Sequence, residues 1–325
     1  MKIFRIVCSV LLAAFLLLTP KLLYRNAQRE FVDARFVRKE ERRLGTIVVY
    51  HIVRHKPYLG SLSVWLQKKA DAYEKKHRGT YIVVEGMDEE AFAERLAYGR
   101  RADAYSFFSG SVYRDLLQPF SACETPLREG LFCTDRCVPY CYTGYCKLTK
   151  DPQDGDGACY YANDVLAARL QGGADGASEE KAQTLFTDLR RAGDLIRYRD
   201  GFALSELSPV DPFTDAVCWI GVDRDTSAEK AAAVAAFVDW LLLPEQQQSL
   251  DALGLFSVRA DVRSEPPESR LKEICKTYAS VETVDPFRWH DAYDALSEDA
   301  AAARGGDGDA AARFTKRLQE LTGWS

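Results

Sequence analysis

Short apolar runs alternate with longer stretches of helical periodicity through the first part of the folded chain. Residues 46–50, 80–85 and 103–108 are rich in β-branched or aromatic residues and predict three buried strands. Residues 59–77 carry apolar side chains on one helical face, and Asp88 can cap a second helix that Gly99 ends. Strand–helix alternation at this spacing predicts a parallel sheet with right-handed crossovers.

A second helical pattern runs from residue 226 to residue 259. Thr226 and Glu229 form a capping-box pair before an apolar face made of Val234, Phe237, Val238 and Leu241. Pro244 ends this helix and can open a short one, which Gly254 suits as a left-handed closing residue. By pattern alone, this segment predicts a helical hairpin.

The order of short motifs is more specific than the periodicity. Residues 237–242 read Phe-Val-Asp-Trp-Leu-Leu, residues 244–247 read Pro-Glu-Gln-Gln, and residues 254–259 read Gly-Leu-Phe-Ser-Val-Arg. These words resemble a segment of the extracellular solute-binding proteins of ABC importers. The likeness is closest to the sugar-binding, maltose-binding-protein-like branch, although Ser257 stands where that family has proline.

Further landmarks of the same family occur in order along the chain. They are Trp65-Leu66 with residues 73–79, then 99–103, a hinge-strand motif at 137–145, and Tyr-Tyr-Ala-Asn at 160–163. The resemblance implies an α/β, two-lobe periplasmic-binding-protein-like fold of type II. Residues 46–138 plus 216–260 would form lobe one, and residues 139–215 plus 261–325 lobe two. The stretch between Asn163 and Pro209, with one helix expected at 180–195, is about half the family's usual length, so a reduced second lobe is expected.

The N-terminus carries a targeting signal. Two basic residues precede an apolar run, Ile6 to Leu18, whose length suits the core of a signal peptide. No small-x-small cleavage site follows closely, which favours an uncleaved signal-anchor over a cleaved signal within residues 1–24. Cys8 lies near the front of the run, which disfavours lipid anchoring. Residues 25–45 are dense in charge of both signs and predict a solvated stalk. The protein is therefore expected outside the cytoplasm, anchored to the membrane, or secreted if the signal is cleaved.

Composition excludes some function classes. The 325 residues are 47% hydrophobic and 28% charged, with a net charge of −5, which is ordinary for a two-domain globular protein. No large basic block lies beyond the N-terminus, so nothing predicts nucleic-acid binding. The sequence has no G-x-S-x-G, P-loop or H-E-x-x-H motif and no evident carboxylate dyad, so we predict neither an enzyme nor a cofactor or metal site.

Ligands of open parallel sheets bind beyond the carboxyl ends of the strands, which singles out a few polar and aromatic residues. The predicted ligand-binding residues are His51, Arg54, Tyr58, Phe108, Ser109, Tyr142, Trp219 and Trp289. Each has a plainer explanation: a polar turn for the first three, helix capping for Ser109, and core packing for the aromatics.

The nine cysteines leave three alternatives open. Five fall at 133, 137, 141, 146 and 159, without a C-x-x-C pair, so a zinc-ribbon pattern is absent. One strand through 137–146 would put Cys137 and Cys141 on one face and Cys146 on the other. The thiols can be buried and free, form one or two disulfides such as Cys123–Cys133, or bind a metal or cluster.

The leading hypothesis is a monomeric solute-binding component of an ABC importer that closes two lobes on a small solute. A carbohydrate is the first expected ligand, and permease subunits are the expected partners. One alternative is a degenerate binding protein with a sensor or assembly role. A different class is a secreted hydrolase or a thiol-dependent redox protein built around the cysteines.

Overall fold

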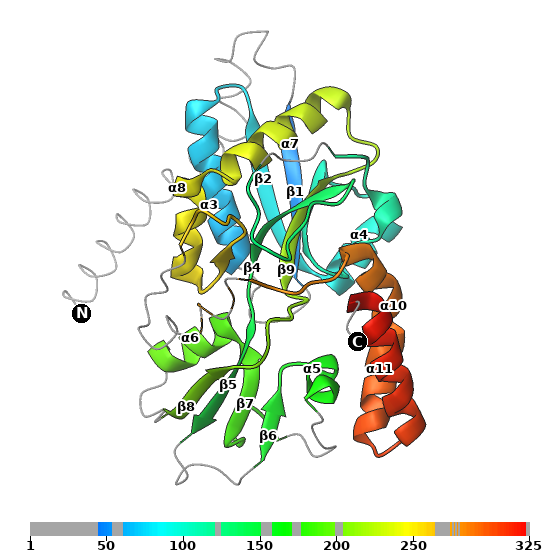
Figure 1. Ribbon diagram of the computed structural model, residues 1–325. Helices are drawn as coiled ribbons and strands as arrows, with labels where there is room; N and C mark the ends of the chain where they lie inside the picture. Colours follow the sequence, from blue (N-terminus) through cyan, green and yellow to red (C-terminus); the bar gives the residue numbers. More distant parts are fainter. Residues whose placement is uncertain are drawn as a thin grey trace, which may run out of the picture.

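Two lobes, each built around its own sheet, make up the computed structural model (Figure 1). The structure describes residues 45–53, 61–120, 125–150, 158–170, 177–198, 204–263, 274, 276, 278 and 280–322. The predicted membrane segment, residues 1–24, lies outside these ranges, as does the predicted stalk except for residue 45. None of the described helices is long and apolar enough to cross a membrane.

Six strands form the sheet of lobe one, in the order β10-β4-β9-β3-β1-β2. They are β1 (Thr46–Val53), β2 (Tyr81–Asp88), β3 (Ala104–Phe108), β4 (Cys137–Tyr142), β9 (Val217–Val222) and β10 (Phe256–Ser257). β1 pairs in parallel with β2 and with β3, which confirms the prediction for these three strands. β9 runs antiparallel between β3 and β4, and β10 runs antiparallel to β4, so the complete sheet is mixed.

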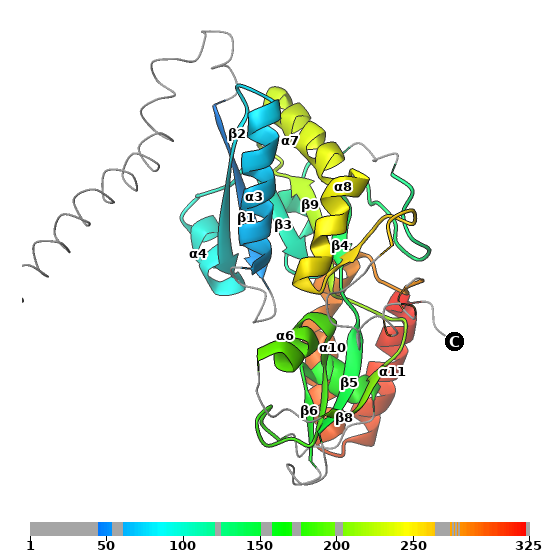
Figure 2. The ribbon, with the colours of Figure 1, turned by 90° about the vertical axis from the view of Figure 1, so that its left-hand side faces the viewer.

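Helices cover both faces of this sheet. They are α3 (Ser61–Lys76), α4 (Glu89–Ala97), α7 (Ala228–Leu241), α8 (Pro244–Gln247) and the short 3₁₀ turns η2 (Arg114–Leu116) and η3 (Gln248–Leu253). Trp65 of α3 stacks on Tyr140 of β4 with ring centroids 6.3 Å apart, and Figure 2 shows α3, α7 and α8 along this side. Phe92 of α4 packs on Tyr105, 5.5 Å away. Ser106 hydrogen-bonds Tyr140, and neighbouring strand residues face opposite ways, so α3 and α4 cover opposite faces.

Four strands form the sheet of lobe two, in the order β6-β7-β5-β8. They are β5 (Tyr145–Lys150), β6 (Cys159–Tyr161), β7 (Thr184–Asp188) and β8 (Leu204–Pro209). β5 is antiparallel to both β7 and β8, and β6 is parallel to β7. The helices of this lobe are α5 (Asp164–Arg169), α6 (Leu189–Tyr198), α10 (Pro286–Arg304) and α11 (Gly308–Thr322).

The two C-terminal helices give lobe two a second apolar core. α10 and α11 lie side by side in Figures 1 and 2, and their buried side chains join Val165 and Phe213 in one cluster: Trp289, Leu296, Ala300, Phe314 and Leu318. Asp299 of α10 accepts hydrogen bonds from Arg313 and Arg317 of α11, each at 2.9 Å. The two C-terminal helices therefore pack with α5 and Phe213 in one apolar cluster.

Three segments link the lobes. Thr143 and Gly144 join β4 to β5, residues 210–216 join β8 to β9, and the chain after β10 leads to α10. The predicted lobe boundary after residue 138 falls inside β4, which stays in the lobe-one sheet as far as Tyr142. The predicted boundary after residue 215 falls just before β9.

Local signals placed several helix ends correctly. Asp88 caps α4, accepting a hydrogen bond from Ala91 N at 2.9 Å, and Pro244 opens α8. Gly254 closes η3 with φ of 69°, the left-handed conformation that glycine tolerates best. The cap of α7 was predicted one residue early: Ser227, not Thr226, accepts from Lys230 N. Thr226 instead donates to the carbonyl of Asp103 at 2.9 Å.

Two element predictions were wrong. The single strand expected through residues 137–146 is divided, because Gly144 passes against the Tyr278 ring and the chain then enters the other sheet as β5. The helix expected over residues 180–195 is a strand, β7, followed by α6. The cysteines of this region therefore belong to two different sheets: Cys137 and Cys141 to that of lobe one, Cys146 to that of lobe two.

Candidate functional site

The loop that follows β3 lies against the start of α10, so it joins lobe one to lobe two. Gly110 N donates to the carbonyl of Pro286 at 3.1 Å. The carbonyl of Gly110 in turn accepts from His290 Nδ1 at 2.6 Å, which fixes that nitrogen as the protonated one. Gly110 has φ of 89°, a conformation that favours glycine. Both the N–H and the carbonyl of Gly110 are therefore hydrogen-bonded to α10, a helix of the other lobe.

The exposed side chains beside this contact are suited to holding a polar ligand. Tyr113 is 44% exposed, and its ring lies 5.4 Å from that of the half-buried His290. Ser111 is buried nearby in sequence, and its hydroxyl has no hydrogen-bond partner among the described residues. An aromatic face and an imidazole thus lie together where the two lobes meet.

The base of the same loop is fixed from β9. Ser109 N donates to the carbonyl of Val217 at 3.0 Å, and the Ser109 hydroxyl accepts from the indole N–H of Trp219 at 2.9 Å. Both side chains are buried. Ser109 and Trp219, two residues predicted to bind ligand, are therefore in contact. In this structure their hydrogen bond attaches the start of the loop to β9.

Hydrogen bonds join the three segments that link the lobes, which we call the crossings. Thr143 N donates to the carbonyl of Ala216 at 3.0 Å, and the hydroxyl of Thr214 donates back to the carbonyl of Thr143 at 2.5 Å. The Tyr145 hydroxyl donates to a carboxylate oxygen of buried Asp215 at 2.7 Å. These contacts link the first two crossings at the point where they leave lobe one.

Tyr278 ties the third crossing to the first. Its hydroxyl donates to the carbonyl of Tyr145, while its own carbonyl accepts from the Tyr142 hydroxyl at 2.6 Å. A Cβ on Gly144 would lie 2.2 Å from the Tyr278 ring, so only glycine fits there. Tyr142, predicted to contact ligand, is 1% exposed and serves this junction instead.

His51 lies in the core of lobe one rather than on an open loop. Its side chain is fully buried, and Nδ1 is 2.8 Å from the Ser106 hydroxyl, which is itself 2.7 Å from the Tyr140 hydroxyl. Burial lowers the pKa of His51 to about 3, so the imidazole is neutral at physiological pH. A charged contact between His51 and a ligand does not fit this position.

The remaining predicted ligand residues divide into two groups. Phe108 and Trp289 are at most 1% exposed; Phe108 packs on His51 at 6.4 Å and Trp289 on Phe213 at 5.9 Å, in different lobes. Arg54 and Tyr58 lie outside the described residues. Tyr113 was missed because its surroundings carry no motif, although the Ser-Gly-Ser run at 109–111 directly after a strand was visible.

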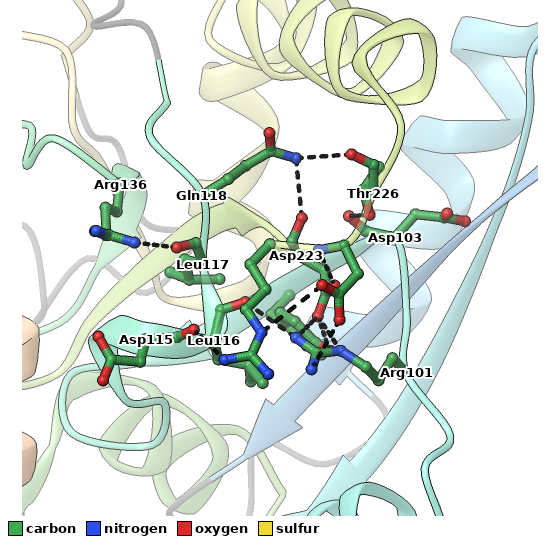
Figure 3. Close-up of polar contacts among 12 residues, drawn as sticks. Arg101, Asp103, Asp115, Leu116, Leu117, Gln118, Arg136, Asp223 and Thr226 are labelled. Atoms are coloured by element: carbon green, nitrogen blue, oxygen red, sulfur yellow. Dashed lines mark hydrogen bonds and ion pairs between the residues drawn. The ribbon is translucent and has the colours of Figure 1, made fainter.

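A polar network at the other end of β3 is structural. The buried carboxylate of Asp223 accepts from Arg101 at 2.7 Å and from the Tyr105 hydroxyl at 2.6 Å. Figure 3 shows Arg101 turned toward Asp223, and Gln118 reaching from the carbonyl of Asp223 to that of Thr226, at 2.9 and 3.2 Å. Burial and the Asp223 hydrogen bond raise the pKa of Tyr105. The network anchors the turn between β9 and α7.

The three cysteines of β4 and β5 are buried thiols in the folded protein. Burial raises the pKa of the Cys137, Cys141 and Cys146 thiols, which keeps them protonated, whereas a reactive cysteine needs a lowered pKa. Within the described ranges no group of three or more His, Cys, Asp or Glu side chains is placed to hold a metal ion. Cys123, of the suggested Cys123–Cys133 pair, lies outside the described residues.

No protein-family model and no curated protein matches the sequence. Solved structures do match. The cyclic α-maltosyl-1,6-maltose binding protein of Arthrobacter globiformis is 12% identical, with 86% of this chain and 98% of that protein covered and a TM-score of 0.59. The extracellular solute-binding protein of Staphylococcus aureus in complex with maltose is 10% identical, with 85% of this chain and 97% of that protein covered and a TM-score of 0.53. Iron-bound HitA of Pseudomonas aeruginosa is 14% identical, with 80% of this chain and 99% of that protein covered and a TM-score of 0.54.

These likenesses span almost the whole of each solved protein, so they concern both lobes and their connection. They confirm the predicted fold, the two-lobe type II periplasmic-binding-protein-like arrangement. The first two of these proteins are named as binding proteins, and the bound molecules named for the last two are maltose and iron. At these identities the likeness establishes the architecture alone.

Proposed function

We propose that this protein is the extracytoplasmic solute-binding component of an ABC import system. The observation that carries the proposal is the pair of lobes joined by three stitched crossings, in a fold shared with proteins that capture solutes. Its partners would be permease subunits that respond to the closed form. It would act as a monomer, outside the membrane, with residues 1–24 as its anchor or signal, and would carry out no chemistry on the solute.

Closure would be a hinge motion at the crossings. Hinges are a few residues between rigid elements that absorb a change in backbone angles. Thr143 and Gly144 are only two residues between strands of two sheets, and residues 210–216 run beside them. A ligand that touches both lobes stabilises the closed form by its differential contacts with that form.

The proposed contact surface is the loop after β3 together with the start of α10. Tyr113 offers an apolar ring face, and the half-buried His290 offers an imidazole beside it. Sugars present apolar C–H faces surrounded by hydroxyls, so an aromatic ring with polar neighbours suits a carbohydrate. Arg54 and Tyr58, which follow β1 in the sequence, are proposed as further contacts. The buried residues Ser109, Trp219 and Trp289 would position this surface.

The first test is a thermal-shift screen of the purified chain with maltose, maltotriose, glucose, amino acids, 4-aminobutyrate and ferric ion. A ligand at 100 times its Kd stabilises a protein by about 2.7 kcal/mol, which is a measurable rise in Tm. We expect a rise with at least one sugar and a calorimetric Kd for it. No stabilisation by any of these solutes would contradict solute capture and favour the degenerate sensor or assembly role.

Variants then locate the contact. Removing the ring in Tyr113→Ala should weaken sugar binding about tenfold, since an aromatic contact contributes about 0.5–1.5 kcal/mol beyond its area. Tyr98→Ala is the matched control, because Tyr98 is 80% exposed and follows α4, away from the loop after β3. An equal Kd for the Tyr113 variant and the control would place the ligand elsewhere.

A further inference from the structure

Cys141 of β4 and Cys218 of β9 are direct partners across two neighbouring antiparallel strands. Figure 1 shows these strands side by side in the lobe-one sheet. Both residues are free thiols with no exposed surface. Cys218 also donates to the Tyr140 hydroxyl at 3.2 Å.

The strand register places the two residues opposite each other at a Cα spacing within the range of disulfides, next to an irregularity in the ladder between Pro139 and Cys141. The Cβ atoms of such a pair lie about 4.5–5.5 Å apart and a disulfide needs about 3.5–4.5 Å, so the bond requires a small approach of the two strands. Thr143 N bonds the carbonyl of Ala216, and alternation along the ladder makes Cys141 and Cys218 a hydrogen-bonded pair with Cα atoms about 5.5 Å apart. Disulfides span Cα separations of about 4.4–6.8 Å, most often about 5.5–6 Å. Residues opposite each other also point to the same face of the sheet.

Cys146 of β5, the next cysteine along the chain, has no cysteine opposite it. Cys146 lies opposite Thr187 on one side and Pro209 on the other. It is as buried as Cys141 and only five positions further along the chain. Burial is therefore common to both thiols, whereas a cysteine directly across the strand pair distinguishes Cys141.

We infer that Cys141 and Cys218 are an oxidation site that forms a cross-strand disulfide when the chain folds in the presence of a disulfide oxidant. The Cys141 thiolate attacks the oxidant RSSR, giving a Cys141–S–SR mixed disulfide and releasing RS⁻. The Cys218 thiolate then displaces the second RS⁻ and forms the Cys141–Cys218 bond. The two cysteines lose two electrons and two protons, and the oxidant becomes two RSH.

Exchange has to precede complete burial. In the folded protein both sulfurs are shielded from solvent, and burial raises the pKa of Cys141, which keeps the thiol protonated and unreactive. During folding both thiols are accessible, and pairing of β4 with β9 brings them together. The bond would enclose residues 142–217, which contain every strand of lobe two. It would join β4, which precedes the first crossing, to β9, which follows the second.

The test is refolding of the reduced, denatured full chain in a buffer of oxidised and reduced glutathione, followed by alkylation of remaining thiols and digestion. Trypsin releases Cys218 alone in residues 200–224 and three cysteines together in residues 137–147. A second cleavage after Tyr140, Tyr142 and Tyr145 separates those three. We expect residues 200–224 to be linked to the fragment that contains Cys141. Alkylated Cys218, or a link from Cys218 to any other cysteine, would overturn the inference.

Stability supplies a second readout. Reduction of the refolded wild-type protein should lower its urea midpoint, because the cross-link restricts the unfolded chain. The Cys146→Ala protein should show the same fall, and the Cys141→Ala protein none. A midpoint in the wild-type protein that does not respond to reduction would argue against the bond. Neither experiment depends on a bound solute, so failure here and failure of the proposed transport function are distinguishable.

Discussion

Replacing His51 with glutamine should remove a specific part of the acid sensitivity of the protein. His51 is fully buried, and its only hydrogen bond among the described residues is the one to Ser106. Burial lowers its pKa from 6.5 to about 3. The folded state therefore holds a neutral imidazole over a pH range in which the unfolded chain binds a proton. The contribution of His51 to stability is therefore fully present above pH 6.5 and falls as the pH drops from 6.5 toward 3.

The magnitude follows from the two pKa values. With an unfolded pKa of 6.5 and a folded pKa of about 3, proton binding to the unfolded chain at pH 5 lowers the free energy of unfolding by about 2 kcal/mol. At pH 7 the same effect is about 0.2 kcal/mol. The His51→Gln protein lacks this term, whatever its stability at neutral pH.

The assay is urea denaturation of both proteins at pH 8, 7 and 5. Between pH 7 and pH 5 the wild-type protein should lose about 2 kcal/mol more than His51→Gln. Between pH 8 and pH 7 the two should change almost equally, which controls for the other titrating groups. An equal loss down to pH 5 would mean that His51 is protonated in the folded state, and hence that its ring is open to solvent or ligand.

Three further substitutions test the junctions of the fold by urea denaturation. Gln247→Met removes four hydrogen bonds of a buried side chain, to two carbonyls, one amide and one hydroxyl, and should destabilise the protein by about 4 kcal/mol at about 1 kcal/mol each. Gly144→Ala pushes a methyl group into the buried Tyr278 ring and should destabilise the protein by about 1–3 kcal/mol. Tyr145→Phe removes the hydroxyl donor to the Asp215 carboxylate and should destabilise the protein by about 2 kcal/mol.

Each of these changes has a control of the same chemistry at an exposed position. Gln248→Met, Gly308→Ala and Tyr98→Phe should each stay within about 0.5 kcal/mol of the wild-type protein, since surface changes usually do. If a buried variant behaves like its exposed control, the corresponding contact does not support the fold as argued.

The fold was predictable because its signals are local. Strand–helix alternation, the Asp88 cap, Pro244 and Gly254 each act through nearby backbone geometry, and the order of motifs added the topology. Gln247, the last residue of the Pro-Glu-Gln-Gln motif, has a structural role. Its side-chain amide is hydrogen-bonded to β4, to the end of α7 and to the backbone at Val258.

The candidate site was harder to predict because burial depends on tertiary packing. His51, Tyr142 and Trp289 are aromatic or polar residues near predicted strand ends, and each is covered by residues remote in sequence. Tyr113 becomes notable only once α10 returns from the end of the chain to lie beside it. The partnership of Cys141 and Cys218 likewise depends on strand register, which no cysteine spacing encodes.

The antiparallel course of β9 also sets an order of assembly. β3 keeps an unpaired edge until residues 217–222 are available, whereas all four strands of lobe two precede β9 in the sequence. A chain made or exported from its N-terminus must therefore hold an incomplete first sheet while the second one forms within it. Exposed strand edges invite aggregation and proteolysis, so a product that stops between residues 210 and 216 should be degraded rapidly although every strand of its second sheet is present.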